Sequence, residues 1–155
     1  RGGHMNDKAN VLIVDDEAVV RHSHLRSLEG SDCNTRAAEG GIQAIQLMEE
    51  YPVDGVLLDL RMPDLDGMDV LKTIKQRWPD SEVVVITGYP SIETAKQAVR
   101  LGAFNYLTKP LGPDEVIKVA NDAMNQKRWA LRSANDDQPE TETLAQQRTN
   151  EFTKH

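Results

Sequence analysis

The pattern that predicts the architecture lies in residues 53–67, VDGVLLDLRMPDLDG. Val56, Leu57 and Leu58 are consecutive apolar residues, which is typical of a strand buried on both faces at the centre of a parallel sheet. Asp59 follows at the carboxyl end of that strand, where ligands bind in open α/β sheets. Asp59 is therefore a candidate functional residue. The alternative is that it only caps the loop or the next helix.

Four further segments are expected to form strands, and a helical pattern follows each strand. The strands are expected to begin near residues 11, 33, 53, 83 and 104, and the segment 33–37 is polar enough for an edge strand. Five such units predict an α/β, doubly wound parallel sheet with helices on both faces. The common strand order for five is 2-1-3-4-5.

This order brings charged and polar residues together at one edge of the sheet. The end of the first strand, Asp15 and Asp16, lies beside Asp59, while Thr87 and Lys109 end the fourth and fifth strands. Clustered carboxylates need a positive partner, and an all-oxygen site suits Mg²⁺. An aspartate can accept a phosphoryl group, with a cation and an ammonium offsetting its charge. Taken singly, these residues could instead be helix caps, a loop hydroxyl and a surface lysine.

The composition limits the classes of function. The net charge is -7, which argues against binding of nucleic acid or an anionic membrane by this chain, and no apolar run is long enough to span a membrane. The single cysteine, Cys33, allows no internal disulfide and indicates the cytoplasm. His22 and His24 do not face each other on the first helix, so both are expected to be exposed to solvent and no zinc site is expected.

The chain divides into three parts. Residues 1–5, RGGHM, are interpreted as an expression scar, residues 6–128 as the folded domain, and residues 129–155 as a helix extension, linker and flexible tail. Ile117, Ala120, Met124 and Leu131 have heptad-compatible spacing, with Lys127 in the seam. This stripe predicts either an exposed helix end or a short coiled coil in a homodimer.

Four stretches of the sequence carry a family resemblance: VLIVDDE at 11–17, VLLDLRMPDLDGM at 56–68, VVITG at 84–88 and YLTKP at 106–110. With them, residues 9 to about 127 resemble the receiver domain of two-component response regulators. The resemblance implies a flavodoxin-like receiver fold. It also implies a phosphorylation-activated switch that accepts a phosphoryl group on Asp59 from a sensor histidine kinase and relays the signal to an output domain or partner.

The resemblance also implies roles for the clustered residues. Asp16 and Asp59 would bind Mg²⁺ directly, Asp15 would help through water, and the backbone carbonyl of Arg61 would be a further ligand. Arg61, and Tyr89 two residues beyond Thr87, border the path of hydrolytic water in the family. We therefore expect slow self-dephosphorylation.

The remaining implied roles concern the phosphoryl group and the response to it. Thr87 would bond a phosphoryl oxygen and Lys109 would pair with it, next to a cis Lys109–Pro110 peptide. Tyr106 would be an aromatic switch that turns inward when Thr87 moves. The face formed by the fourth helix, fifth strand and fifth helix would then contact the output domain or partner.

Residues 87–90, TGYP, and 98–111, AVRLGAFNYLTKPL, look most like receivers of the NtrC type, which control AAA+ transcriptional activators. The chain has no G-x-x-x-x-G-K-[ST] loop, so it is either an excised receiver or a stand-alone regulator. We expect a phosphoacceptor rather than an enzyme with a separate substrate. A haloacid-dehalogenase-type phosphohydrolase would need an acid where Arg61 stands. A phosphate-independent interaction module stays open as an alternative.

Overall fold

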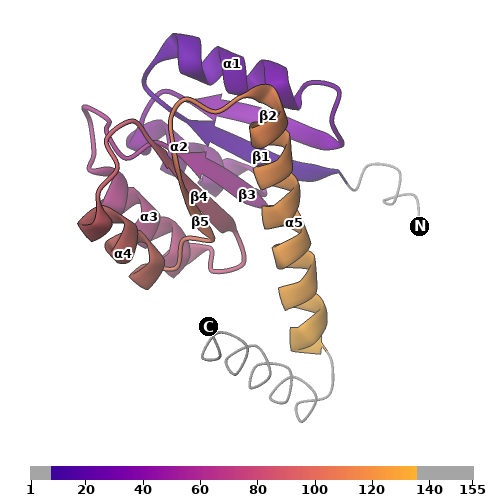
Figure 1. The fold of residues 1–155 in the computed structure, drawn as a ribbon. Helices are drawn as coiled ribbons and strands as arrows, with labels where there is room; N and C mark the ends of the chain where they lie inside the picture. The colour runs from indigo at the N-terminus through magenta and orange to yellow at the C-terminus, as the bar shows by residue number, and fades with distance from the viewer. Residues whose placement is uncertain (1–7, 136–155) are drawn as a thin grey trace.

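The computed structural model describes residues 8–135, so the interpretations of residues 1–5 and of the chain beyond 135 lie outside the described residues. Within residues 8–135, five strands alternate with five helices (Figure 1). The strands are β1 (Ala9–Val14), β2 (Cys33–Ala38), β3 (Gly55–Leu58), β4 (Glu82–Thr87) and β5 (Asn105–Thr108). The helices are α1 (Ala18–Leu28), α2 (Gly41–Glu50), α3 (Gly67–Arg77), α4 (Ile92–Arg100) and α5 (Pro113–Asn135). Each strand begins within two residues of its expected position.

The sheet confirms the predicted fold class and strand order. All strand pairs are parallel and the order is β2-β1-β3-β4-β5. The register pairs Val14 of β1 with Leu58 of β3. The next residue of each strand continues this alignment, because the Asp59 N–H donates to the Val14 carbonyl at 2.9 Å. The sheet therefore places the acids that follow β1 and β3 side by side.

Two apolar clusters hold the helices on opposite faces of the sheet. One cluster joins β1, β3 and β4 to α2, α3 and α4, and its helical members include Met48, Leu71 and Ile74. The other joins the sheet to α1 and α5 through residues such as Leu28 and Val116. The strands contribute alternate residues to the two clusters, which explains why residues 56–58 are continuously apolar. The helices thus cover both faces and leave the carboxyl ends of the strands open.

Helix α5 continues well beyond the body of the fold, and its apolar stripe has a role inside the chain. Ala120 and Met124 are buried against the sheet, and Ile117 packs beside them. Lys127 forms an ion pair with the carboxylate of Asp54, so it does not need a seam between two protomers. Packing within the chain explains the heptad-like spacing as far as Lys127. Leu131, 39% exposed, follows Lys127 by four residues on the part of α5 that extends past the sheet (Figure 1).

One expectation about α1 is wrong. His22 is exposed, but His24 is buried with 4% of its surface accessible. His24 precedes the buried Leu28 by four residues and therefore shares its face of the helix. Burial lowers the pKa of His24, which keeps the imidazole neutral near physiological pH.

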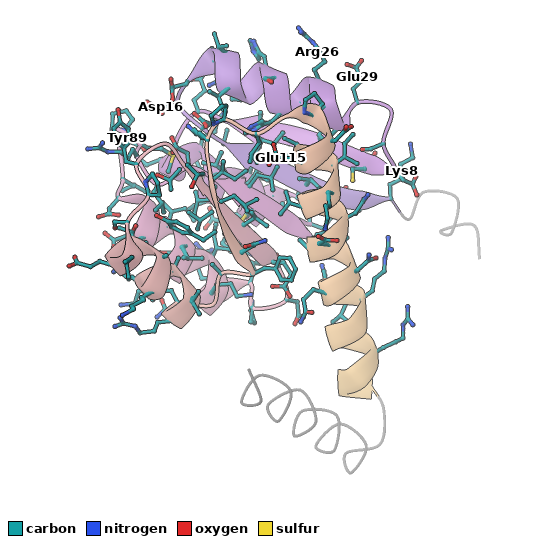
Figure 2. All side chains as sticks on the ribbon, in the orientation of Figure 1. Lys8, Asp16, Arg26, Glu29, Tyr89 and Glu115 are labelled. Atoms are coloured by element: carbon teal, nitrogen blue, oxygen red, sulfur yellow. The ribbon has the colours of Figure 1, made fainter. Side chains whose placement is uncertain are left out.

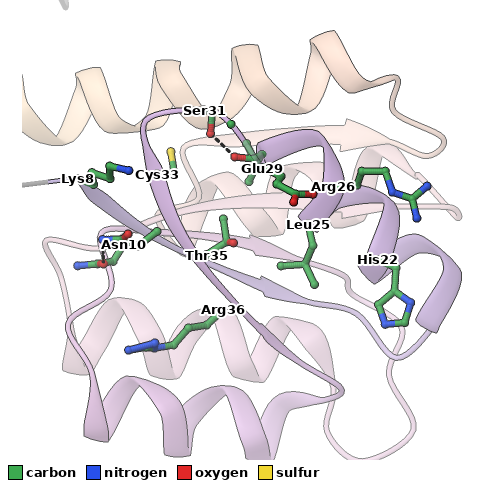
Figure 3. A pocket seen from close by; sticks show the side chains of 13 residues that line it. Lys8, Asn10, His22, Leu25, Arg26, Glu29, Ser31, Cys33, Thr35 and Arg36 are labelled. Atoms are coloured by element: carbon green, nitrogen blue, oxygen red, sulfur yellow. Dashed lines mark hydrogen bonds between the residues drawn. The ribbon is translucent and has the colours of Figure 1, made fainter. Parts of the chain in front are cut away.

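No helix within residues 8–135 combines the length and apolar character needed to cross a membrane. A broad hollow of about 900 Å³ lies between α1 and the edge strand β2 (Figure 3). Its walls include Leu25, Arg26 and Cys33, and none of the clustered acids lines it. The hollow is therefore separate from the candidate site.

Candidate functional site at the carboxyl ends of the strands

Three carboxylates converge where β1 and β3 end. Asp15, Asp16 and Asp59 each offer an oxygen atom, and these atoms lie within 4.8 Å of one another. Asp15 and Asp59 are buried, with 2% and 4% of their surfaces accessible, whereas Asp16 is exposed. In Figure 2, Asp16 and Tyr89 lie at one end of the molecule and Lys8 lies at the other. The chain therefore gathers acidic oxygens at a solvent-accessible edge.

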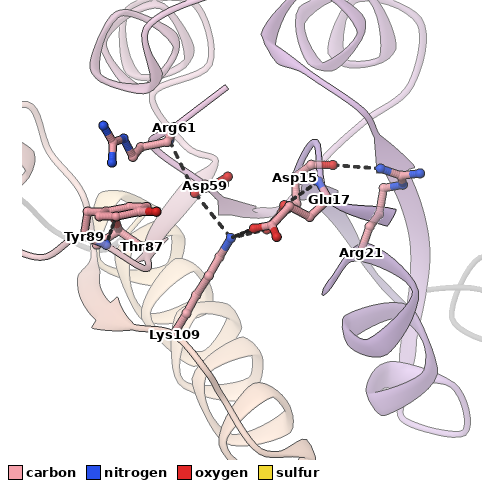
Figure 4. A network of polar contacts seen from close by, with 8 residues as sticks. All are labelled: Asp15, Glu17, Arg21, Asp59, Arg61, Thr87, Tyr89 and Lys109. Carbon is pink, nitrogen blue, oxygen red and sulfur yellow. Dashed lines mark hydrogen bonds and ion pairs between the residues drawn. The ribbon is translucent and has the colours of Figure 1, made fainter. Parts of the chain in front are cut away.

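Lys109 supplies the positive charge of the cluster (Figure 4). Its Nζ atom lies 2.8 Å from Asp15 Oδ2 and 3.5 Å from Asp59 Oδ1. The backbone after β5 directs this side chain, because the Lys109 N–H donates to the Thr87 carbonyl at 2.8 Å. The Lys109–Pro110 peptide bond is cis. The residue that follows β5 thus places its ammonium beside the carboxylates that follow β1 and β3.

The charges in the site are unbalanced. Burial, together with the negative charge of Asp15, raises the pKa of Asp59 to about 6, although Lys109 and the Arg61 N–H act in the opposite direction. Burial also acts to lower the pKa of Lys109, but the hydrogen bond and charge of Asp15 outweigh it and raise that pKa. Lys109 is therefore an ammonium at neutral pH. One ammonium only partly offsets the repulsion between the carboxylates.

The donor set fits a hard divalent cation. Mg²⁺ takes oxygen ligands and keeps several waters, so two or three carboxylates on an open edge suit it better than a closed cage would. The exposed Asp16 leaves room for water, and the raised pKa of Asp59 shows that added positive charge would stabilise the ionised site. The residues present are thus compatible with Mg²⁺ at this cluster.

Thr87 and Tyr89 form the wall on another side of Asp59. Thr87 is buried, and its hydroxyl accepts a hydrogen bond from the Tyr89 N–H at 3.0 Å. The guanidinium carbon of Arg61 lies 4.0 Å from the centroid of the Tyr89 ring, which is a cation–π contact. Figure 4 shows Arg61 and Tyr89 flanking Asp59 on the side away from Asp15. The structure thus places in contact the two residues that are expected to border the path of hydrolytic water.

Tyr106 does not join the acid cluster. Its hydroxyl accepts a hydrogen bond from the Ser91 N–H at 3.2 Å and shares another with Thr94 Oγ1 at 2.6 Å. Tyr106 is half-buried and packs against the apolar cluster beneath α4. The residue expected to act as a switch is therefore tied to the start of α4 in this structure.

Two residues near the cluster are not among the site residues predicted from the sequence. Glu17 Oε1 lies 3.4 Å from the Lys109 ammonium, and Arg21 donates to the Asp15 carbonyl at 2.9 Å. Glu17 directly follows Asp15 and Asp16, so its position in the sequence is enough to predict that it lies near the cluster. The position of Arg21 in the sequence does not predict its hydrogen bond to Asp15, because that bond depends on where α1 passes the end of β1.

The comparisons with known proteins agree with this geometry. Residues 11–121, which contain Asp15, Asp59, Thr87 and Lys109, match the family described as the response regulator receiver domain. The chain belongs to the response regulator receiver domain family. This membership supports a role in two-component signalling.

The relatives support the resemblance to NtrC-type receivers. The chain is 37% identical over 110 residues to a putative NtrX-like response regulator of Rickettsia felis, which covers 70% of this chain and 23% of that protein. It is 31% identical over 138 residues to the DNA-binding transcriptional regulator NtrC of Escherichia coli K12, covering 88% of this chain and 29% of that protein. The chain thus spans about a quarter of the length of these curated relatives.

A solved structure shows the same arrangement of strands and helices. The crystal structure of NtrX from Brucella abortus aligns with a TM-score of 0.78 and 32% identity, over 83% of this chain and 29% of that one. The receiver fold is therefore confirmed, and the similarity to NtrX and NtrC is consistent with the expected resemblance to NtrC-type receivers.

Proposed function

We propose that this domain is a phosphorylation-activated switch in which Asp59 accepts a phosphoryl group from a sensor histidine kinase. The observation that supports this most strongly is the placement of the Asp59 carboxylate. It is buried, lies 3.5 Å from the Lys109 ammonium and shares an oxygen cluster with Asp15 and Asp16. A buried carboxylate next to a fixed ammonium and a cation site can act as a nucleophile toward phosphorus.

In the proposed reaction, an oxygen of ionised Asp59 attacks the phosphorus of a phosphohistidine, and the bond between phosphorus and the histidine nitrogen breaks. The pKa of about 6 leaves Asp59 mostly ionised at neutral pH. Lys109 would pair with a phosphoryl oxygen, and the Thr87 hydroxyl would donate to another. The same crevice would permit only slow hydrolysis. The domain is therefore proposed as a phosphoacceptor and not as an enzyme with a separate substrate.

The proposed cofactor is Mg²⁺. Asp16 and Asp59 would bind it directly, Asp15 through water, and the Arg61 carbonyl would complete the protein ligands. When bound, the ion would offset negative charge on the oxygens of the transferring group.

The hydrogen bonds around Thr87 suggest how the signal would leave the site. If the Thr87 hydroxyl turns toward a phosphoryl group, the Tyr89 N–H loses its acceptor, and the segment that leads to Ser91 is loosened. Ser91 donates to Tyr106, so Tyr106 would be released to turn inward. The face formed by α4, β5 and α5 would then change for an output domain or partner. By analogy with NtrC, the output would be transcriptional control in the cytoplasm.

The proposed function is tested by locating the modification. After incubation with Mg²⁺ and acetyl phosphate, borohydride reduction of the acyl phosphate and peptide mapping should place the modification on Asp59 alone. Modification at another acidic residue, with Asp59 unmodified, would contradict the proposal.

The Arg61–Tyr89 stack leads to a prediction about the lifetime of the phosphoryl group. Tyr89→Ala removes the ring that holds the Arg61 guanidinium beside Asp59, so water should reach the phosphoryl group more easily. Phosphate loss should accelerate about two- to fivefold, the factor equivalent to the roughly 0.5–1 kcal/mol of an exposed cation–π contact. The rate is measured by following the phosphorylated mass over time after the phosphodonor is removed. An unchanged rate would show that Tyr89 does not shield the site.

A further inference from the structure

Hydrogen bonds as well as packing hold the loop between β3 and α3, residues 60–66, in which Leu60 and Met62 lie against the apolar cluster. Most of its residues are exposed to solvent. Its base is closed, because the Gly67 N–H donates to the Leu60 carbonyl at 3.1 Å. The loop carries Arg61, whose N–H donates to Asp59 Oδ1 at 3.4 Å. Whatever holds the middle of this loop therefore affects where the backbone of Arg61 lies relative to Asp59.

Asp64 holds the middle of the loop against the start of α2. Its Oδ1 accepts from the Gly41 N–H at 3.1 Å, and its Oδ2 accepts from the Ile42 N–H at 3.0 Å. Oδ1 also accepts from the Leu65 N–H at 2.8 Å. Helix α2 has Gly40 at its N-cap and therefore no capping side chain of its own. A carboxylate from a distant loop thus supplies the acceptors that the first amides of α2 need.

Two consecutive glycines make this contact sterically feasible. A Cβ atom at Gly40 would lie 2.7 Å from Asp64 Oδ2. A Cβ atom at Gly41 would lie 2.6 Å from a methyl carbon of Val70 and 2.9 Å from one of Leu65. Because the backbone of Gly40 is extended, with φ -170°, its conformation does not require glycine. The need for glycine at this position comes from the approach of Asp64.

From this geometry we propose that Asp64 is a positioning residue for phosphoryl acceptance. By fastening residues 60–66 to the start of α2, it sets the backbone groups of Arg61 at the place where the cation and the phosphoryl group bind. This inference rests on the proposed function. Loss of a residue that orients a metal ligand typically reduces metal affinity by about 10- to 100-fold.

The first test compares Asp64→Ala with a matched control in the full chain. The Mg²⁺ dissociation constant is measured by isothermal titration calorimetry, and the phosphorylation rate with acetyl phosphate by intact-mass spectrometry. Asp64→Ala should weaken Mg²⁺ binding about tenfold and slow phosphorylation. Asp64→Asn should be intermediate, since one oxygen acceptor remains. The control Gln43→Ala removes the hydrogen bond from the Glu39 N–H near the same end of α2 but leaves Asp64 in place, so its Mg²⁺ affinity should equal that of the wild type.

The second test displaces Asp64 without removing it. Gly40→Ala should push the carboxylate off the α2 amides and weaken Mg²⁺ binding, and the double variant Gly40→Ala/Asp64→Ala should be no weaker than Asp64→Ala alone. Wild-type Mg²⁺ affinity in Asp64→Ala, or an equal loss in Gln43→Ala, would overturn the role of Asp64. If the wild type itself neither binds Mg²⁺ nor gains a phosphoryl group, the proposed function fails instead.

Discussion

Asp59→Asn is expected to be more stable than the wild type at about pH 7.5 in the absence of divalent cations. In the folded wild type the pKa of Asp59 rises from 3.8 to about 6, so keeping the carboxylate ionised in the fold costs free energy. A shift of about two units corresponds to about 3 kcal/mol, as an upper estimate. For a domain of this size that gain would raise Tm by roughly 10 °C. Thermal unfolding followed by circular dichroism measures it.

The difference in stability between Asp59→Asn and the wild type should depend on pH, and the raised pKa of Asp59 sets the direction of that dependence. Because the folded pKa is raised, the folded state holds more protons than the unfolded state between about pH 4 and 6. Wild-type stability attributable to Asp59 therefore falls as the pH rises through this window, while the neutral asparagine is unaffected. The difference in Tm should be small near pH 4 and reach its maximum above about pH 6.5. Asp80→Asn, at an exposed carboxylate after α3, is the control and should show no such trend.

Mg²⁺ provides an internal check on that result. Saturating Mg²⁺ should stabilise the wild type and leave Asp59→Asn nearly unchanged, so the gap in Tm narrows. A wild type that is as stable as Asp59→Asn throughout the pH range would contradict the conclusion that ionising Asp59 in the folded site costs free energy.

Gly67→Ala is expected to destabilise the domain by about 3 kcal/mol or more, because a Cβ atom at this position meets main chain that cannot rotate away. That atom would lie 2.4 Å from the Leu60 Cα and 2.6 Å from the Leu60 carbonyl oxygen. Gly67 is buried at the first position of α3, where the loop after Asp59 closes on itself. Urea unfolding gives the loss of free energy directly.

Gly88→Ala is the matched control for Gly67→Ala. A Cβ atom at Gly88 would meet only the Lys109 Cδ, at an ordinary 3.9 Å, so the change should alter stability by less than about 0.5 kcal/mol. Equal losses at the two positions would show that close approach to Leu60 is not the reason for glycine at position 67.

The convergence of the acids could be predicted because it depends on topology alone. Once each strand is followed by a helix, the carboxyl ends of parallel strands must share one edge, and the order 2-1-3-4-5 sets Asp15 beside Asp59. The apolar run at 56–58 and the polar edge strand at 33–38 are direct consequences of burial. These features need no knowledge of side-chain conformation.

The features that the sequence does not predict depend on contacts between residues that are far apart in the chain or on how a helix packs. The distance between Asp64 and Gly41 follows from how one loop lies on another helix, and no local pattern encodes it. The heptad-compatible position of Lys127 gives no sign of its ion pair with Asp54, which lies far away in the sequence. The polarity of its imidazole predicts an exposed position for His24. His24 is instead buried, because it lies on the same face of α1 as the buried Leu28.

The central claim, that Asp59 accepts a phosphoryl group, is tested most directly by intact-mass spectrometry after incubation with acetyl phosphate. The wild type should gain the mass of one phosphoryl group when Mg²⁺ is present and remain unmodified when it is absent. Asp59→Asn should remain unmodified in both cases. A wild type that gains no mass with Mg²⁺, or an Asp59→Asn variant that gains as much as the wild type, would contradict the claim.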